Sequence, residues 1–405
     1  MLHPAVRCFD SRRFVNSFEQ ELLSQLATIR DQNLFRELRR IDSAQGPHIR
    51  FQGREVLNFS SNDYLGLANH PAVLEAAKRG IDKYGAGSGA SRLICGSLQV
   101  HHELEEALAR FKETPAAIAF SSGYAAALGT LGALLGKDDV IIIDKLVHAS
   151  IVDAAHLCGA KLRVFPHNDV NELETILKWA NARGPCRKII ATESVFSMDG
   201  DLAPLREIVE LKDHYGAWLM LDEAHATGLF GENRRGLAEA FELSERVDIS
   251  MGTLGKALGS AGGFVCGSCA LVDVLINRAR SFIFSTAPPP AQAAAATAAI
   301  GLVESKTGEQ LQSTLWARVD QLKNGLIGST WSLPVVRSAI IPLMIGDERP
   351  AMEIATALRE AGLFIPAIRF PTVARGEARL RLTVTAAHTP EDVTTLVHHL
   401  THLTT

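Results

Sequence analysis

The sequence predicts an α/β protein with a seven-stranded, mostly parallel sheet in a large domain, followed by a smaller C-terminal α+β domain. Between about residues 116 and 267, short β-branched runs alternate with helical patterns, which is typical of a parallel sheet covered on both faces. Beyond about residue 305 the pattern changes to helices separated by two strands. The 405 residues suffice for roughly two or three domains and a large buried core.

Seven apolar runs are the candidate strands of the sheet. They cover residues 116–121, 140–144, 162–165, 188–193, 217–222, 247–252 and 262–267. Helical patterns lie in most of the gaps, over residues such as 123–135, 170–182 and 204–215. This alternation indicates strands joined by helical crossovers.

The chain divides into three expected parts. Residues 1–62 form a helical arm that leads to a strand at 55–60, residues 63–305 form the large domain, and residues 306–405 form the C-terminal α+β domain. In the last part we expect strands at 339–346 and 378–384, and helices at 351–361 and 390–402.

Composition excludes several classes of protein. Hydrophobic residues make up 47% and charged residues 21% of the chain, so disorder is not expected. The 41 basic and 45 acidic residues form no long run of one sign, which argues against nucleic-acid or anionic-lipid partners. The longest apolar stretch, 288–303, is shorter than the ~20 residues that a membrane span needs. The first residues lack the apolar segment of a secretory signal, so we expect a cytoplasmic protein.

Cysteine usage indicates neither a disulfide framework nor a metal site. Six cysteines are irregularly placed, and a reducing cytosol does not favour disulfides. Cys266 and Cys269 form a CxxC motif, but no second pair or histidine cluster accompanies it. We therefore expect no metal.

Polar residues at the carboxyl ends of the predicted strands are the candidates for chemistry, because ligands of open α/β sheets bind at that edge. Asp222 ends the fifth run, and His225 follows three residues later in the tetrapeptide DEAH. That tetrapeptide also occurs in nucleotide-hydrolysing helicases. The helicase interpretation fails, because the sequence around Lys256 lacks the GxxxxGK[ST] phosphate loop.

Lys256 follows the sixth run in the sequence GTLGKALG. A lysine held in a glycine-bounded turn beyond a buried strand loses solvation, which lowers the pKa of its amine as Schiff-base chemistry requires. The first run ends in Ser121, Ser122 and Gly123, where a helix is predicted to begin. Free backbone N–H groups at such a helix start suit a phosphate, although Ser-Gly is also a common helix cap.

These three features together are more specific than any one alone. A phosphate cradle, a carboxylate at a strand end and a lysine 34 residues later match what pyridoxal phosphate requires. A Rossmann site is disfavoured, because the glycines of residues 84–91 follow a helical pattern and no GxGxxG is present.

The chain resembles the α-oxoamine synthases, a family of fold-type-I pyridoxal-phosphate enzymes. The motifs that carry the resemblance appear in order: NDYLGL (62–67), FSSGY (120–124), DKLVHASIVDA (144–154), HND (167–169), ESVFSMDGDLAPL (193–205), DEAHATGLFG (222–231) and GTLGKALG (252–259). The resemblance implies an acyltransferase that condenses an amino acid with an acyl-CoA and releases CO₂ and CoA.

The resemblance also implies roles for single residues. Lys256 would form the covalent link to the cofactor, Asp222 would pair with its pyridine nitrogen, and His225 would bond its phenolic oxygen. His148 would stack on the cofactor ring and orient the thioester carbonyl. We expect these four residues to be catalytic.

Further residues are implied around the cofactor. The phosphate would be held by the set Ser122, Gly123, Tyr124 and Thr253. Glu193 and Ser197 would line the site. Ser285 and Thr286 would reach the phosphate of a neighbouring subunit, so the resemblance implies a homodimer with shared active sites.

Substrate binding is implied for Asn62, Arg369 and Arg381, with Arg381 gripping the amino acid's carboxylate. The nearest match in the family joins L-alanine to a pimeloyl thioester, carried by CoA or a carrier protein, in biotin biosynthesis. The alternatives are glycine with acetyl-CoA, serine- or aminolevulinate-type condensations, an aminotransferase, and a non-catalytic binding protein. Arg36, Arg39 and Arg40 lie in a segment of helical pattern and would meet a pimeloyl carboxylate or CoA phosphates, unless they are simply solvated.

Overall fold

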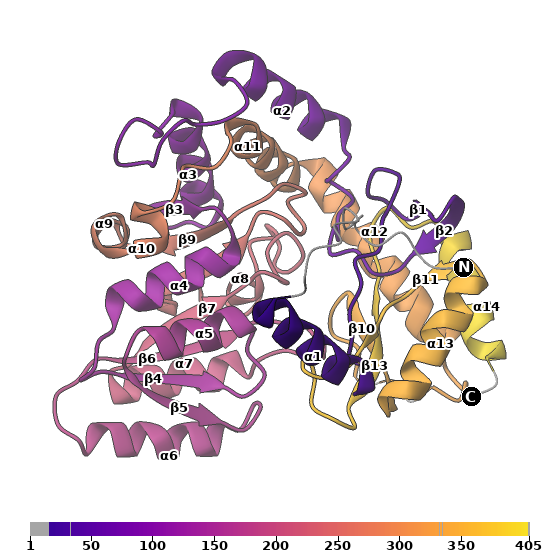
Figure 1. Ribbon diagram of the computed structural model, residues 1–405. Helices are drawn as coiled ribbons and strands as arrows, with labels where there is room; N and C mark the ends of the chain where they lie inside the picture. Colours follow the sequence, from indigo (N-terminus) through magenta and orange to yellow (C-terminus); the bar gives the residue numbers. More distant parts are fainter. Residues whose placement is uncertain (1–15, 33, 332, 334, 404–405) are drawn as a thin grey trace.

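The computed structural model describes residues 16–32, 34–331, 333 and 335–403. Seven strands form one sheet in the order β3-β9-β8-β7-β6-β4-β5 (Figure 1). Their bounds are β3 (Ala116–Phe120), β4 (Val140–Asp144), β5 (Lys161–Phe165), β6 (Lys188–Glu193), β7 (Trp218–Asp222), β8 (Ile249–Thr253) and β9 (Gly263–Gly267). Only β9 runs antiparallel to its neighbours, β3 and β8. The expected mostly parallel sheet is confirmed.

Helices cover both faces of this sheet. They are α2 (Pro71–Tyr84), α3 (Gln99–Phe111), α4 (Gly123–Leu134), α5 (Ala149–Leu157), α6 (Val170–Asn181), α7 (Leu205–Tyr215), α8 (Leu237–Ala240), α9 (Cys269–Arg278), α10 (Arg280–Ile283) and α11 (Pro290–Glu304). In β9, Phe264 and Cys266 join the apolar cluster that includes α3 and α11, while Val265 joins the cluster that includes α4. Alternate residues of one strand thus serve two cores, as the period of two requires.

Two small sheets accompany the helices of the C-terminal part, on the right in Figure 1. Their strands are β1 (His48–Phe51), β2 (Arg54–Asn58) and β11 (Leu363–Phe364) in one, and β10 (Ile340–Gly346), β12 (Ala367–Ile368) and β13 (Ala378–Thr383) in the other. The helices are α12 (Lys306–Gly325), α13 (Glu348–Glu360) and α14 (Pro390–His402). Since β2 pairs in parallel with β11, the N-terminal strand packs with the C-terminal part of the chain.

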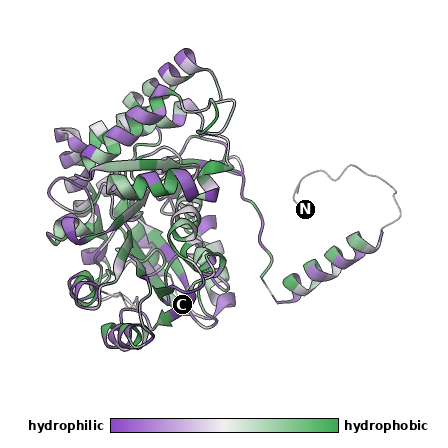
Figure 2. Ribbon diagram, turned by 90° about the vertical axis from the view of Figure 1, so that its left-hand side faces the viewer, coloured by the Kyte–Doolittle hydropathy of each residue, from purple (hydrophilic) through white to green (hydrophobic). Residues whose placement is uncertain are grey.

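The N-terminal arm differs from expectation after its first helix. Helix α1 (Ser17–Asp31) stands apart from the body in Figure 2 and has no buried residue. Residues 34–40, expected as helix around Arg36, Arg39 and Arg40, are not helical. The carbonyl of Phe35, which a helix would use internally, accepts a hydrogen bond of 2.9 Å from Arg369 Nη2 instead. Tertiary contact therefore overrides helical propensity here.

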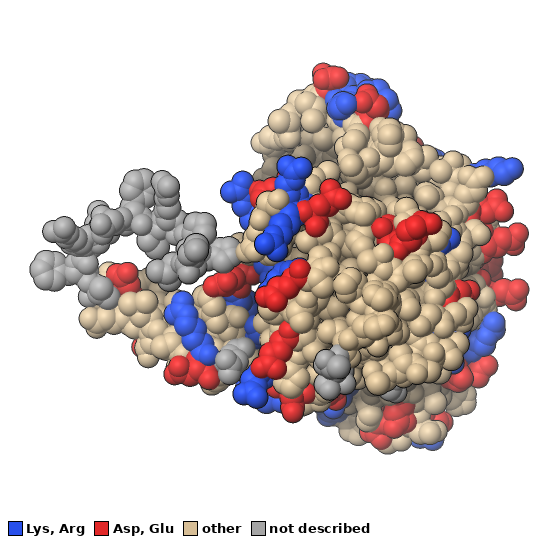
Figure 3. All heavy atoms as spheres, turned by 90° about the vertical axis from the view of Figure 1, so that its right-hand side faces the viewer, with Lys and Arg blue, Asp and Glu red and all other residues tan. Residues whose placement is uncertain are grey.

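Surface charge on the face shown in Figure 3 is mixed, with Lys and Arg side chains interspersed among Asp and Glu. Within the part of the chain that the structure describes, no helix is both long enough and apolar enough to cross a membrane.

A buried ion pair fixes the chain just beyond β7. Lys112 Nζ, at the end of α3, lies 2.7 Å from Glu223 Oε2, and both side chains are 3% exposed. Glu223 Oε1 also accepts a hydrogen bond of 3.0 Å from the backbone N–H of Ala238. Because Glu223 directly follows Asp222, the last residue of β7, this ion pair fixes the carboxyl end of the strand.

We expect Lys112→Ala to lower the free energy of unfolding by about 3–5 kcal/mol, since it leaves the Glu223 carboxylate buried without its cation. Denaturant titration of the purified protein measures this loss. Lys78→Ala is the control, because its ion pair with Glu75 is exposed and contributes less than about 1 kcal/mol. Equal effects of the two substitutions would contradict the prediction.

Candidate active site

Three acidic or hydroxyl side chains meet at the carboxyl ends of neighbouring strands. Glu193 ends β6, Asp222 ends β7 and Thr253 ends β8, and the first two are paired in register. Lys256 lies in the turn directly after β8. The sheet edge thus carries Asp222 and Lys256, which the strand-end argument selected, and Glu193 and Thr253, which the resemblance implied.

Lys256 lies against a buried histidine. Its Nζ is 3.0 Å from His225 Nε2, and His225 Nδ1 is 2.5 Å from the hydroxyl of Tyr64. Tyr64 is 1% exposed and was not among the predicted site residues, although it lies within the NDYLGL motif. A buried tyrosine hydroxyl usually has a hydrogen-bond partner, but the sequence does not show that Tyr64 is buried or that His225 is its partner.

The electrostatics of this group favour an amine that can give up its proton. Burial lowers the pKa of Lys256, while the nearby carboxylates of Asp222 and Glu193 raise it. Burial raises the pKa of Glu193 to about 8, with Asp222 adding to the rise. Burial likewise raises the pKa of Asp222, and Lys256 opposes that shift. The pKa of His225 falls well below its usual value through burial and the Lys256 charge, so the ring is neutral.

The start of α4 forms a cradle for an anion. The Ser122 side chain caps the helix by accepting a hydrogen bond of 3.0 Å from the Ala125 N–H. The Thr253 hydroxyl is buried and has no hydrogen-bond partner among the described residues. A Cβ atom at Gly123 would lie 2.6 Å from Thr253 Cγ2, so this close approach requires glycine. The helix start and the unpartnered hydroxyl together suit a phosphate.

Tyr124 directs its side chain elsewhere. Its hydroxyl donates a hydrogen bond to Asp153 on α5, and the residue is 42% exposed. Its backbone N–H lies in the first turn of α4, where N–H groups have no partner within the helix and can bind an anion.

His148 is the cap of α5, and its Nδ1 lies 2.8 Å from the Ser150 hydroxyl. Partial burial lowers its pKa, Asp222 raises it and Lys256 lowers it. The charges of Asp222 and Lys256 therefore both act on the His148 ring.

A loop between β6 and α7 joins the strand ends to the C-terminal part. The Ser197 N–H donates to Glu193 Oε2 at 3.2 Å, and the Ser197 carbonyl accepts from Arg381 Nε at 2.6 Å. Arg381 Nη1 donates to Asn62 Oδ1 at 3.1 Å. Glu193 Oε1 is buried without a partner among the described residues. The predicted residues Asn62, Glu193, Ser197 and Arg381 thus form one connected group.

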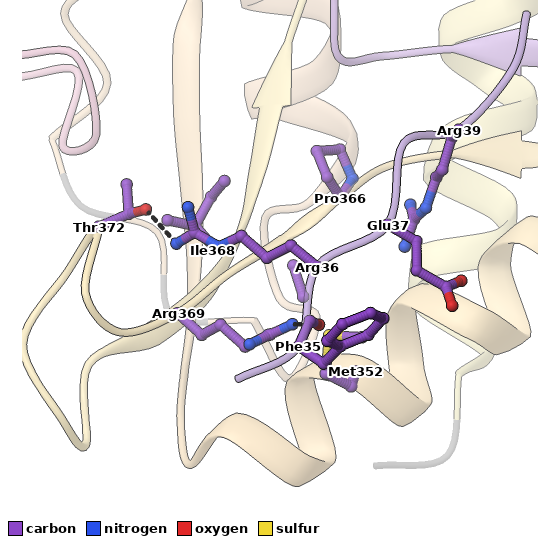
Figure 4. Close-up of a pocket in the computed structure, with 10 residues that line it drawn as sticks. Phe35, Arg36, Glu37, Arg39, Met352, Pro366, Ile368, Arg369 and Thr372 are labelled. Carbon is purple, nitrogen blue, oxygen red and sulfur yellow. Dashed lines mark hydrogen bonds between the residues drawn. The ribbon is translucent and has the colours of Figure 1, made fainter. Parts of the chain in front are cut away.

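Arg369 belongs to a separate pocket of about 400 Å³, shown in Figure 4. Its walls include Arg36 and Arg39 from the arm, together with the apolar residues Phe35, Met352 and Ile368. Arg369 Nη1 is buried without a hydrogen-bond partner among the described residues. Burial lowers the pKa of Arg39, and the charges of Arg359 and Arg369 lower it further. Burial also lowers the pKa of Arg369, with the charge of Arg36 adding to the shift. Glu37 also lines the pocket, but the three arginines Arg36, Arg39 and Arg369 outnumber this single carboxylate. The excess of positive charge and the free donor favour an anionic ligand.

Arg40 does not line this pocket. It pairs with Asp42 at 2.5 Å on the surface, and its side chain is 88% exposed. Arg36 Nη2 instead donates to the Thr372 hydroxyl at 3.0 Å inside the pocket (Figure 4).

Ser285 and Thr286 lie beside the end of β3. Both line a small hollow with Ser121, and Thr286 forms an isolated β-bridge with Ser91. Thr286 is exposed, so it is free to face a second molecule.

The residues at the sheet edge fit pyridoxal phosphate. Two buried oxygens, Thr253 Oγ1 and Glu193 Oε1, lack partners among the described residues and face this region of strand ends. The donor set also holds an amine with a lowered pKa, a neutral histidine and a buried carboxylate. An aldehyde, a phenolic oxygen and a pyridine nitrogen are the matching groups of this cofactor.

Comparison with known proteins shows the family of the chain. Residues 54–400 match the model of the family "Aminotransferase class I and II". The chain is 47% identical over 374 residues to the 8-amino-7-oxononanoate synthase of Geobacter sulfurreducens, covering 92% of this chain and 95% of the relative. It is 44% identical to the synthase of Bacillus pumilus over 373 residues, 92% of this chain and 94% of the relative.

Solved structures show the same fold. Serine palmitoyltransferase from S. paucimobilis, with a bound PLP-myriocin aldimine, superposes with a TM-score of 0.88 at 31% identity and covers 96% of this chain and 98% of its own. The 8-amino-7-oxononanoate synthase of Francisella tularensis superposes with a TM-score of 0.73 at 29% identity, covering 85% and 96%. By its identity to the curated relatives over nearly its whole length, the chain belongs to the 8-amino-7-oxononanoate synthase family of pyridoxal-phosphate-dependent acyltransferases.

Proposed function

We propose that this chain condenses L-alanine with a pimeloyl thioester to give 8-amino-7-oxononanoate, CO₂ and the free thiol of CoA or of a carrier protein, in biotin biosynthesis. The observation that carries the proposal is the Lys256 amine at 3.0 Å from a neutral His225, beside the carboxylates of Asp222 and Glu193. The names of the relatives supply the substrate pair.

The residues at the sheet edge would hold the cofactor. Lys256 would bind its aldehyde through Nζ, and Asp222 would keep a proton at the ring nitrogen. His225 would bond the phenolic oxygen with one ring nitrogen. The phosphate would be held by Ser122, Gly123, Thr253 and the backbone amide of Tyr124. When bound, pyridoxal phosphate supplies a ring that accepts an electron pair from the substrate's Cα.

Three side chains would act on the substrates. Arg381 holds the carboxylate of L-alanine in a planar two-donor fork, which Asn62 and Ser197 orient. The amine of Lys256 would take the proton from Cα, because burial lowers its pKa and so favours the unprotonated form that a base requires. His148 donates a hydrogen bond to the thioester carbonyl while the thiol leaves.

The arginine pocket would receive the far end of the acyl chain. Its apolar residues Phe35, Met352 and Ile368 suit methylene groups, and Arg36 and Arg369 suit a terminal carboxylate. This arrangement selects a chain with an acid at its end over a simple fatty acyl chain.

We propose further that the enzyme is a homodimer in the cytoplasm. In this dimer Ser285 and Thr286 would reach the phosphate of the second subunit, and the exposure of Thr286 supports that role. The cysteines in the described residues are free, which suits a reducing compartment. The division into residues 1–62, 63–305 and 306–405 stays our working domain assignment.

Substrate choice within the fold is testable directly. The structural likeness to serine palmitoyltransferase makes L-serine one competitor, and glycine with acetyl-CoA is the other. We expect CoA release with L-alanine and pimeloyl-CoA to exceed all other pairs in a panel of three amino acids and several acyl-CoAs. Preference for glycine or L-serine would contradict the proposed substrate.

We expect Lys256→Ala to reduce turnover by about 10⁴-fold or more, because both the covalent attachment and the base are lost. Borohydride reduction followed by mass spectrometry should place a reduced adduct on Lys256 of the unmodified enzyme and none on the variant. Lys323→Ala, at an exposed position on α12, should retain both. A Lys256 variant that kept activity and adduct would refute the assignment.

We expect Arg381→Gln to raise KM for L-alanine by roughly 100-fold, since a charged hydrogen bond to the carboxylate is lost. KM for pimeloyl-CoA should change by less than about threefold in steady-state assays, because Arg381 contacts the other substrate. A matching rise in both KM values would argue against carboxylate binding.

We expect Arg36→Gln to raise KM for pimeloyl-CoA by roughly 10-fold and to leave KM for heptanoyl-CoA unchanged, because only the first chain ends in a carboxylate. Arg40→Gln is the matched control, since Arg40 pairs with Asp42 outside the pocket. Equal losses with both thioesters would show that Arg36 does not read the chain end.

A further inference from the structure

A histidine bridges two carboxylates at a distance from the Lys256 turn. His167 Nδ1 lies 3.0 Å from Asp144 Oδ1, and His167 Nε2 lies 2.8 Å from Asp201 Oδ2. Asp144 ends β4 and is 1% exposed, whereas Asp201 belongs to the loop of residues 194–203 that follows β6. We call these three residues the histidine bridge. The proposed chemistry uses none of them.

The charge state of the histidine bridge follows from its geometry. Each ring nitrogen lies within hydrogen-bond distance of a carboxylate oxygen, and only the imidazolium form donates to both. Asn168 Nδ2 also lies 3.2 Å from His167 Nε2. Burial lowers the pKa of His167, but hydrogen bonds to Asp144 and Asp201 raise it to about 10. A cation between two anions therefore ties the loop to the large sheet.

Neighbouring contacts fix the bridge in place. The Asn168 N–H donates to Asp144 Oδ2 at 2.8 Å, and its Nδ2 donates to Asp201 Oδ2 at 3.0 Å. Asn168 has a φ of +57°, a conformation that asparagine tolerates better than most residues. The edge of the His167 ring packs against Phe196, with ring centroids 4.4 Å apart. These contacts account for His167 and Asn168 of the HND motif, and Asp169 caps α6 by accepting hydrogen bonds from the N–H groups of Asn171 and Glu172.

The same loop is held from its other side by the C-terminal part. Arg379 donates to the Met198 carbonyl and pairs with Asp199. The Ser338 hydroxyl donates to the Gly200 carbonyl at 2.7 Å. At Gly200, with a φ of +69°, a Cβ would lie 2.2 Å from the Ile340 carbonyl oxygen. The loop is thus clamped between the large sheet and the β10–β13 sheet.

One carbonyl of this loop orients the proposed substrate arginine. The Ser197 carbonyl accepts from Arg381 Nε at 2.6 Å, and Ser197 directly follows Phe196, on which the His167 ring packs. Phe196 N–H donates to the Asp201 carbonyl at 3.0 Å, which closes the loop onto the bridge. A movement of Asp201 would therefore reach the Ser197 carbonyl through two hydrogen-bonded or packed steps.

We propose that His167 is a positioning residue: the histidine bridge holds the loop of residues 194–203 so that the Ser197 carbonyl aims the Arg381 guanidinium at the carboxylate of the amino acid. This inference rests on the proposed role of Arg381. It predicts that loss of the bridge impairs amino-acid binding and spares thioester binding.

The test uses the holoenzyme and the variant His167→Gln. We expect KM for L-alanine to rise about 10-fold while kcat and KM for pimeloyl-CoA change less than about twofold, because one charge-assisted tether is lost. Amide hydrogen exchange in residues 194–203 should become faster. His156→Gln, at an exposed position on α5, should change none of these values. If His167→Gln yields no folded protein, Asp201→Asn, at a partly exposed position, tests the same tether.

A double-variant cycle separates this inference from the proposed function. If the bridge acts through Arg381, His167→Gln adds little to the KM of an Arg381→Gln enzyme. Additive effects of the two substitutions would overturn the inference, and so would an unchanged KM for L-alanine and unchanged amide exchange in His167→Gln. In either case, a raised KM for L-alanine in Arg381→Gln would still uphold the proposed function. An unchanged alanine KM in Arg381→Gln would instead overturn the carboxylate site and, with it, the role given to the bridge.

Discussion

The structure depends on keeping one amine and two carboxylates together away from water. Lys256, Asp222 and Glu193 lie at a sheet edge where burial disfavours the charged form of each side chain. Burial therefore lowers the pKa of Lys256 and raises the pKa values of Asp222 and Glu193. Such a group is stable only while its members partly compensate one another. The buried Lys112–Glu223 ion pair fixes the residue that follows Asp222, and the neutral His225 lies within hydrogen-bond distance of Lys256. Both contacts help to hold the amine and the carboxylates together.

The large sheet could be predicted closely from the sequence, because its strands are buried on both faces and read as unbroken apolar runs. Strands β4 and β6 occupy the residues expected for them, and the other five differ by a residue or two. Strands β1, β11 and β12 were missed, and the last two contain only two residues each, too few to show periodicity. The helix expected around Arg36 was wrong, since the Phe35 carbonyl bonds Arg369 from more than 300 positions away. No local pattern records such a contact.

The candidate site divides in the same way. Asp222 and Lys256 follow from strand ends and glycine spacing, and the structure brings both to one edge. The resemblance to a family supplied Asn62, Ser197 and Arg381, which hydrogen bonds join across the chain. Tyr64 and His167 were not assigned roles, because their partners lie on segments far away in the sequence. Contacts at long range are what sequence reasoning could not reach.

The arm at the N-terminus has a consequence for how such enzymes diversify. Its residues Phe35, Arg36, Glu37 and Arg39 line the arginine pocket, whereas helix α1 has no buried residue. Under the role proposed for this pocket, changes in residues 35–39 would alter which acyl chain is accepted and leave Lys256, Asp222 and Glu193 in place. Related enzymes could then differ in the acyl chain that they accept and still share the same catalytic residues.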